Sequence, residues 1–393
     1  MKKVWDKWTR IALVKRILVG LILGAILGIA VPQATGIAIL GDVFVSALKA
    51  IAPLLVFFLV ISSLCNAGKS HGGVIKTVII LYMFSTVLAA VIAVFASMAF
   101  PVKMTLANAA TDTSAPQGIV EVLNNLLLNV VANPVSSLVN ANYVGILMWA
   151  VLLGLAFRAA DKMTKKVLAD VADGISMVVT WIINLAPFGI FGLVFNTVST
   201  NGLDIFTTYG KLLLLLVGCM LFIYFVTNPL LVYWCIRQNP YPLIFQCLKR
   251  SALTAFFTRS SAANIPVNMK VCEEMGLDRD TYSVTIPLGA TINMDGAAIT
   301  ITVMTMATAF TLGIHVDIPT AIILSLLAAL SACGASGVAG GSLLLIPMAC
   351  SLFGISDDIS MQVVAVGFII GVVQDSVAVS YTHLRAHETL MNI

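Results

Sequence analysis

Long continuous apolar runs restrict the fold of this chain more than any other feature of its sequence. They are rich in Leu, Val, Ile, Ala and Phe, and most reach the ~20 residues that a helix needs to cross a bilayer. The alternating pattern of a membrane β-barrel is absent. Membrane spans are therefore predicted at 11–31, 41–65, 76–100, 143–157, 174–197, 211–235, 283–313 and 360–378.

Composition places the chain outside the soluble class. It is 60% hydrophobic and 10% charged, whereas soluble domains carry roughly a quarter charged residues. We predict an all-α polytopic membrane protein, and the net charge of +4 gives no indication of a nucleic-acid partner.

The first apolar run lacks a small-residue cleavage site, which favours an uncleaved helix over a signal peptide. The cysteines lie mostly within apolar runs and show no metal-ligand spacing, so we expect small core residues rather than disulfides; they are Cys65, Cys219, Cys235, Cys247, Cys272, Cys333 and Cys350.

Lys and Arg alternate between the loops, and this alternation predicts the orientation. Basic residues gather in the N-terminus and in loops 66–76, 158–166 and 236–250. Loops 32–40 and 198–210 carry none, and the long polar insert 101–142 carries only Lys103. Because cytoplasmic loops of membrane proteins are enriched in Lys and Arg, the N-terminus is predicted to be cytoplasmic.

The alternation breaks around FFTRSSAANIPVN, residues 256–268. The segment 251–269 lies between two basic loops, although a single crossing would separate them. It is also too short and too polar for a full span. A re-entrant hairpin that enters and leaves from the cytoplasm satisfies both observations.

A second segment, 319–356, presents the mirror case. It is longer than one span, has a glycine-rich centre from Gly334 to Gly341, and lacks Lys and Arg on both flanks. A hairpin that dips in from outside fits this pattern. Interrupted apolar segments at corresponding positions of two halves are typical of transporters built from inverted repeats, and they point to the binding site.

Ser260 and Ser261 lie in the first hairpin. A broken helix exposes backbone N–H groups and the partial positive charge of a helix N-terminus, so adjacent serines there suit a carboxylate. The alternative is that the hydroxyls bond back to helix carbonyls and only bend the helix.

Asp295 lies inside a predicted span, where a carboxylate is costly and indicates function. Gly289, Thr291, Asn293 and Gly296 around it would let the helix unwind and offer carbonyl oxygens. A carboxylate with neutral oxygens suits a hard cation such as Na⁺. A proton-carrying aspartate, or a structural pair with Arg259, remains an alternative.

Asp375, in the last span, is a candidate partner for a substrate ammonium group, or else an aspartate at the membrane interface. Tyr82, Ser85 and Thr86 place hydroxyls on one helical face at spacings i, i+3 and i+4, a pattern that also serves ordinary helix packing. Arg259 receives no role in substrate binding.

Two other classes of function fit less well. An intramembrane enzyme would need a base beside a nucleophilic serine, but the histidines, His71, His315, His383 and His387, lie outside the predicted spans. A channel usually shows a repeated filter or pore ring, and none is evident. We therefore expect no catalytic residues and no cofactor.

The motifs TRSSAANIPV, IPLGATINMDG and GASGVAGGS, supported by APFGIFGLV, resemble the sodium-coupled dicarboxylate/amino acid:cation symporter family, closest to its bacterial serine/threonine branch. The likeness extends nearly to Asp375. It implies eight transmembrane helices plus two re-entrant hairpins, a homotrimer in the lipid of the bacterial inner membrane, and an elevator movement. Residues 1–235 would be mainly scaffold, with the third and sixth helices moving alongside a transport core at 236–378.

The resemblance also implies roles for particular residues. Ser260, Ser261 and the backbone around Val338 would hold the substrate carboxylate, and Asp375 its amino group. Sodium ions would be bound by the following residues: Gly289, Asn293 and Asp295 with Tyr82, Ser85 and Thr86, and Thr291 with the carbonyls of Ala332, Cys333 and Ala335.

The substrate is predicted from Ala297. Members of this family that carry acidic substrates place a threonine just after the NMDG motif, whereas this chain has Ala297. A pocket without that donor suits L-serine or L-threonine, and Ser342 could bond the substrate hydroxyl. The alternative is symport of acidic amino acids or C4-dicarboxylates with Na⁺ or H⁺. The polar tail 379–393 lacks the family's pattern and is expected to be non-native.

Overall fold

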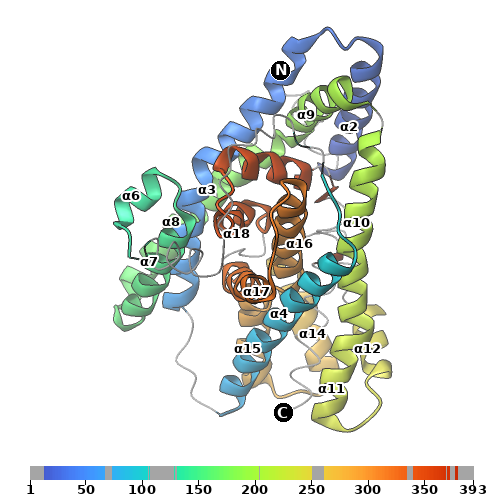
Figure 1. The fold of residues 1–393 in the computed structure, drawn as a ribbon. Helices are drawn as coiled ribbons and strands as arrows, with labels where there is room; N and C mark the ends of the chain where they lie inside the picture. Colours follow the sequence, from blue (N-terminus) through green and yellow to red (C-terminus); the bar gives the residue numbers. More distant parts are fainter. Residues whose placement is uncertain are drawn as a thin grey trace, which may run out of the picture.

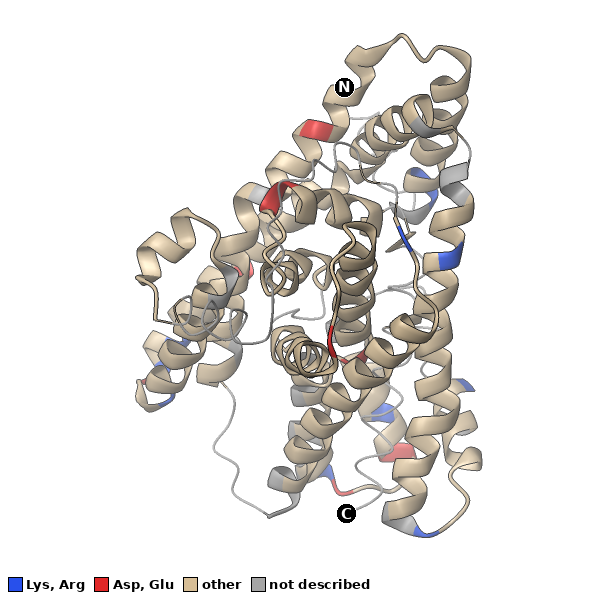
Figure 2. Cartoon of the chain, in the orientation of Figure 1, with Lys and Arg blue, Asp and Glu red and all other residues tan. Residues whose placement is uncertain are grey.

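The computed structural model describes residues 13–66, 73–104, 131–202, 204–249, 261–333 and 340–368, with a few residues outside these ranges: 106, 128, 370, 371, 377 and 378. All the regular elements assigned within this part of the chain are helices (Figure 1). Several are long and apolar enough to cross a membrane: Thr35–Asn66, Thr77–Ala99, Lys162–Asn184 and Thr207–Trp234. Charged residues are sparse along the helices (Figure 2). The predicted all-helical membrane architecture is confirmed at this level.

The first half of the chain forms four helices close to their predicted spans. They are α2 (Leu13–Ala30), α3 (Ala38–Asn66), α4 (Gly73–Ala99) and α7 (Tyr143–Ala156), and the short α6 (Pro134–Val139) precedes α7. The outward face of α2 is apolar, since Ile22 is 54% and Ile26 53% exposed. Exposed apolar stripes of this kind suit contact with lipid.

The predicted span 174–197 is wrong, because two helices meet within it. They are α8 (Lys162–Asn184) and α9 (Ala186–Asn201). Pro187 lies in the first turn of α9, where its missing N–H is tolerated, and α8 ends just before it. The predicted loop 158–166 is also too long, since Asp161 caps α8 by accepting the Thr164 backbone N–H at 2.8 Å. That hydrogen bond lowers the pKa of Asp161.

The predicted span 211–235 begins earlier and is not a plain α-helix. It comprises α10 (Asp204–Phe222), a π-helical segment at Ile223–Thr227, and α11 (Asn228–Ile236). The predicted loop 236–250 contains the helix α12 (Tyr241–Cys247). The prediction of a loop is therefore wrong over these residues, because a polar, proline-containing sequence gave no indication of a short helix.

The first predicted hairpin continues further along the chain than expected. Helix α14 (Ser261–Glu274) includes the second serine and passes the predicted boundary at 269. Residues 250–260, with Ser260 and Arg259, lie outside the described part. The second predicted hairpin has its arms in α17 (Ile318–Ala332) and in α18 (Ile346–Ser351), which follows a short 3-10 turn (Leu343–Leu345). The Ser331 hydroxyl lies 3.6 Å from Met348 Sδ, so the two arms touch.

The predicted span 283–313 is broken in the middle. Helix α15 (Arg279–Ile292) ends at Ile292 with Asn293 as its C-cap residue, and α16 (Asp295–Thr311) begins after Met294. The interruption falls where the sequence predicted unwinding. Every residue of α16 from Asp295 to Ala309 is buried, so this helix forms the centre of the molecule.

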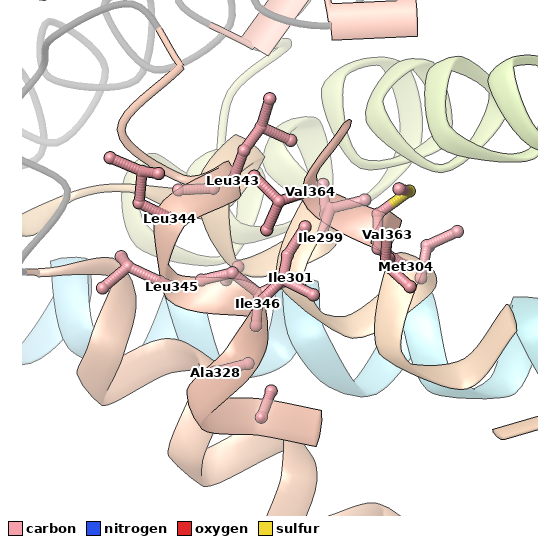
Figure 3. Close-up of a cluster of buried hydrophobic side chains, with 14 of the residues drawn as sticks. Ile299, Ile301, Met304, Ala328, Leu343, Leu344, Leu345, Ile346, Val363 and Val364 are labelled. Atoms are coloured by element: carbon pink, nitrogen blue, oxygen red, sulfur yellow. The ribbon is translucent and has the colours of Figure 1, made fainter. Parts of the chain in front are cut away.

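The core surrounds α16. Helices α4, α10, α17 and α18 pack against it, as Figure 1 shows for α4, α17 and α18. Figure 3 shows apolar side chains of α16, α17, the 3-10 turn, α18 and the terminal helical segment 357–368 meeting: Ile299, Ile301, Met304, Ala328, Leu343, Leu344, Leu345, Ile346, Val363 and Val364. Such a core fixes the position of the helix break.

Contacts along the helices give their relative directions. Ser85 and Thr86 of α4 meet Asp295 at the start of α16, and Met104 beyond α4 meets Thr311 at its end. Helices α4 and α16 are therefore parallel. The chain between Ser360 and Ala378 runs in the direction opposite to α16, because Gly296 faces Ala378 whereas Cys350 interacts with both Thr305 and Ser360.

Helices α2 and α9 meet along a glycine seam, which we define as Gly20, Gly24 and Gly28 of α2. These glycines face, in order, the carbonyl oxygens of Pro187, Phe191 and Phe195. Any Cβ at Gly24 would lie 2.6 Å from the Phe191 oxygen, and at Gly28 3.0 Å from the Phe195 oxygen. Both sets are spaced by four residues, so the helices run parallel and in register, and the seam requires glycine.

Candidate functional site

The site begins with Asp295, which is fully buried at the first residue of α16. Ser85 Oγ donates a hydrogen bond to Asp295 Oδ2 at 2.6 Å, and Thr86 Oγ1 donates to Oδ1 at 2.8 Å. Hydrogen bonds to an ionised carboxylate are short and strong, and each typically contributes about 1.5–3 kcal/mol. Adjacent hydroxyls on α4 thus satisfy both carboxylate oxygens.

Thr86 and Tyr82 lie one helical turn apart on the same face of α4. The Thr86 hydroxyl also lies 3.0 Å from the Tyr82 carbonyl oxygen. The Tyr82 hydroxyl donates to the Thr285 carbonyl of α15 at 3.4 Å. Tyr82, Ser85 and Thr86 therefore lie on one face of α4, as their spacing predicted, and this face meets α15 and the start of α16. The contact with Thr285 could not be read from the sequence.

Gly289 lies directly against Tyr82. A Cβ added at Gly289 would lie 2.9 Å from the Tyr82 hydroxyl oxygen, so a larger residue here would displace the Tyr82 side chain. Thr291 belongs to the same helix, but its side chain lies outside the described part. The two helices are thus held close on the side facing the break.

Asn293 occupies the break itself and is fully buried. Neither its side-chain oxygen nor its nitrogen has a hydrogen-bond partner within the described residues. Buried amides normally have partners, so this side chain fits a ligand-binding role. The carbonyl end of α15 adds partial negative charge next to the Asp295 carboxylate. Together these groups make an environment suited to a cation.

The end of α17 reaches the same break. The Cys333 thiol donates to the Ile292 carbonyl oxygen at 3.6 Å and lies 3.8 Å from Met83 Sδ. Ala332 beside it is fully buried. The end of α17, the first arm of the predicted second hairpin, therefore contacts both α15 and α4 at the site. The contacts of the Cys333 side chain with Ile292 and Met83 were not predicted from the sequence, which indicated a core residue and a role for its carbonyl.

The predicted substrate residues are described only in part. Ser261 is buried at the first residue of α14, Ala297 is buried in α16, and Ser342 is buried before the 3-10 turn. Ser260, Ala335, Val338 and Asp375 lie outside the described part of the chain. The structure thus brings Ser85 and Thr86 to Asp295 and Tyr82 to Gly289, and it describes only part of the predicted substrate-binding set.

Comparison with known proteins adds the family context. A model of the sodium:dicarboxylate symporter family matches residues 13–382. A serine/threonine transporter SstT of Bifidobacterium adolescentis is 58% identical over 378 residues, covering 96% of this chain and 88% of that protein. A protein of the same name from Streptococcus thermophilus is 55% identical over 377 residues, covering 96% of this chain and 94% of that protein.

Proposed function

Since the chain belongs to the sodium:dicarboxylate symporter family, we propose that it takes up L-serine and L-threonine by coupling their transport to sodium. It is a transporter and not an enzyme. The carrying observation is the buried Asp295, whose two carboxylate oxygens accept hydrogen bonds from the Ser85 and Thr86 hydroxyls at the helix break. A carboxylate inside the membrane attracts a cation, and sodium matches the oxygen donors.

The sodium ligands proposed are those gathered around the break. One group of residues would bind sodium at the break: Asp295, Asn293, Gly289, Tyr82, Ser85 and Thr86. A second sodium position would be completed by the second hairpin, and its ligands would be Thr291 and the backbone of Ala332, Cys333 and Ala335. The buried, unpartnered amide of Asn293 supports the first assignment. The contact of Cys333 with Ile292 supports the second, because it places the hairpin at the break.

The substrate would lie between the two hairpins. Ser260, Ser261 and the backbone near Val338 would bind its carboxylate, Asp375 its ammonium group, and Ser342 its hydroxyl. Ala297 adds no hydrogen-bond donor, and this favours a small neutral substrate over an acidic one. Buried Ser261 and Ser342 support the arrangement, since each can offer a hydroxyl away from water.

Helix directions support the hairpins. If α7, the α8–α9 pair and the α10–α11 pair each cross the membrane once, a parallel α4 and α16 requires that residues 237–278 make no net crossing. The same reasoning applies to residues 312–356, because the chain between Ser360 and Ala378 runs in the direction opposite to α16. Both hairpins would then be re-entrant, from opposite sides.

Larger-scale proposals follow from the same family. The protein would work as a homotrimer in the bacterial inner membrane, with a cytoplasmic N-terminus and an elevator-type movement of residues 236–378. Helix α4 and the α10–α11 pair would move with this part, which agrees with the packing of α4 and α10 on α16.

Uptake in proteoliposomes tests the function. Radiolabelled L-serine should accumulate under an inward Na⁺ gradient, and unlabelled L-threonine should compete. Equal uptake from a K⁺ or H⁺ gradient alone would contradict sodium coupling. Stronger competition by L-aspartate than by L-threonine would contradict the neutral substrate and favour the acidic alternative.

A further inference from the structure

The helix that runs from α10 to α11 has a local defect at its π segment (Ile223–Thr227). Asn228 and Pro229 follow immediately. In a regular α-helix the N–H of residue 229 would donate to the carbonyl of Phe225. Proline has no N–H, so that carbonyl loses its regular donor. A backbone carbonyl in an apolar environment needs a replacement.

The replacement comes from α12, the helix that leads into the first hairpin. Tyr241 Oη donates to the Phe225 carbonyl oxygen at 3.1 Å. A second bond runs the opposite way, since Tyr224 Oη donates to the Ile244 carbonyl oxygen of α12 at 3.4 Å. Figure 1 shows α12 beside α11. Each helix thus gives a tyrosine hydroxyl to a backbone carbonyl of the other.

This reciprocal pair joins two functional segments. Tyr224 is 5% exposed and Ile244 fully buried, so the hydrogen bond between them is buried. Tyr241 is 42% exposed, so its hydrogen bond to Phe225 lies near the protein surface. Along the chain, α12, here called the arm, is the last described α-helix before Ser261, one of the two serines proposed to bind the substrate carboxylate.

We propose that Tyr241 and Tyr224 are positioning residues of the first hairpin: their hydroxyls fasten α12 to the helix defect at Pro229 and so hold the arm that precedes the substrate serines along the chain. The proposal rests on the proposed transport function for its consequence, but not for its geometry. Loss of either hydroxyl loosens the arm and weakens serine binding, with a smaller effect on maximal transport rate.

Cys247 offers a readout that is independent of transport. It is fully buried at the end of α12, so its thiol reacts with N-ethylmaleimide only when the arm loosens. The reaction at Cys247 is followed by mass spectrometry of the purified protein. Tyr241→Phe and Tyr224→Phe should each speed it by about fivefold, the factor expected for one net hydrogen bond.

The matched control is Tyr233→Phe. Tyr233 lies on α11 and is 52% exposed, and its hydroxyl makes no hydrogen bond with any residue that the structure describes. Its removal should leave the rate at Cys247 unchanged. A rate in Tyr241→Phe equal to that in Tyr233→Phe overturns the proposal.

A second variant separates hydrogen bonding from general packing. Pro229→Ala restores a backbone N–H that can donate to the Phe225 carbonyl. In that background Tyr241→Phe should have no further effect on Cys247. An undiminished effect would overturn the link to Pro229.

Serine uptake completes the experiment. Tyr241→Phe should raise the KM for serine by about threefold to fivefold, as loss of a single hydrogen bond allows. An unchanged KM with faster Cys247 alkylation would overturn the positioning role. Absence of serine uptake in the unaltered protein would instead refute the proposed substrate, while the alkylation result would still report on the arm.

Discussion

At the scale of single residues, the partners of Asp295 are chemically informative. Ser85 and Thr86 stabilise the carboxylate by hydrogen bonds without cancelling its charge. An arginine or lysine in their place would neutralise the site and remove its attraction for a cation. Hydroxyl groups also offer lone pairs that an ion can use, so the arrangement suits reversible binding.

Asp295→Asn tests this reading with little change in volume. The substitution removes the charge, and the Na⁺ concentration for half-maximal uptake should rise by at least about tenfold, because close unit charges interact by several kcal/mol in a protein. Serine uptake measured over a range of Na⁺ concentrations gives the answer. An unchanged sodium dependence would refute the assignment.

Asp173→Asn serves as the control for that measurement. Asp173 is exposed on α8, away from the helix break, and has the same chemistry. Its substitution should leave the sodium dependence as it was. A shift equal to that of Asp295→Asn would show that the effect comes from overall charge.

The residue scale also shows what a sequence can predict about the site. Spacing placed Tyr82, Ser85 and Thr86 on one face, and a lone intramembrane Asp295 indicated a function. Their mutual contact joins residues some 210 positions apart, and no local pattern specifies such a pairing. The contacts of the Cys333 side chain could not be predicted for the same reason, since its partners lie on other helices.

At the scale of elements, the glycine seam between α2 and α9 should tolerate no side chain. Gly24→Ala would place a Cβ 2.6 Å from the Phe191 oxygen. Overpacking of this kind typically costs about 1–3 kcal/mol, which exceeds the ~1 kcal/mol that alanine gains over glycine in a helix. The melting temperature in detergent should therefore fall.

Gly174→Ala in α8 is the matched comparison. Nothing lies within 4 Å of a Cβ at that position, so the helix propensity of alanine should leave stability equal or slightly higher. If both substitutions had the same effect, the seam would not depend on close backbone approach.

Elements differed in how well the sequence predicted them. Uninterrupted spans such as 41–65 matched their helices within a few residues because apolar length is a local property. The span 174–197 failed because the polar turns of α8 resemble a loop and Pro187 permits a new helix start. The π segment also escaped prediction, although Pro229 within an apolar span was an available signal.

At the scale of the whole molecule, the re-entrant first hairpin has a direct test. Arg237 and Arg279 flank it, and both are exposed. Cysteines placed by Arg237→Cys and Arg279→Cys should react with a membrane-impermeant maleimide only after the cells are permeabilised. Both positions should behave alike, because the hairpin returns to the side from which it enters.

His315→Cys provides the opposite reference. His315 is exposed between α16 and α17, on the side predicted to be external, so it should react in intact cells. Labelling of one flank of the first hairpin from outside, with the other protected, would mean that the segment crosses the membrane.

The glycine seam has a mechanical consequence for the whole protein. The contacts of the glycine seam repeat every four residues on both helices, so α2 cannot slide along α9 or rotate over it unless the two helices first separate. The two helices therefore behave as one rigid unit. Gly189 of α9 contacts Phe44 of α3, so a third helix belongs to the same rigid unit. Movement during a transport cycle must then occur elsewhere, at the boundary between this rigid unit and the elements around α16.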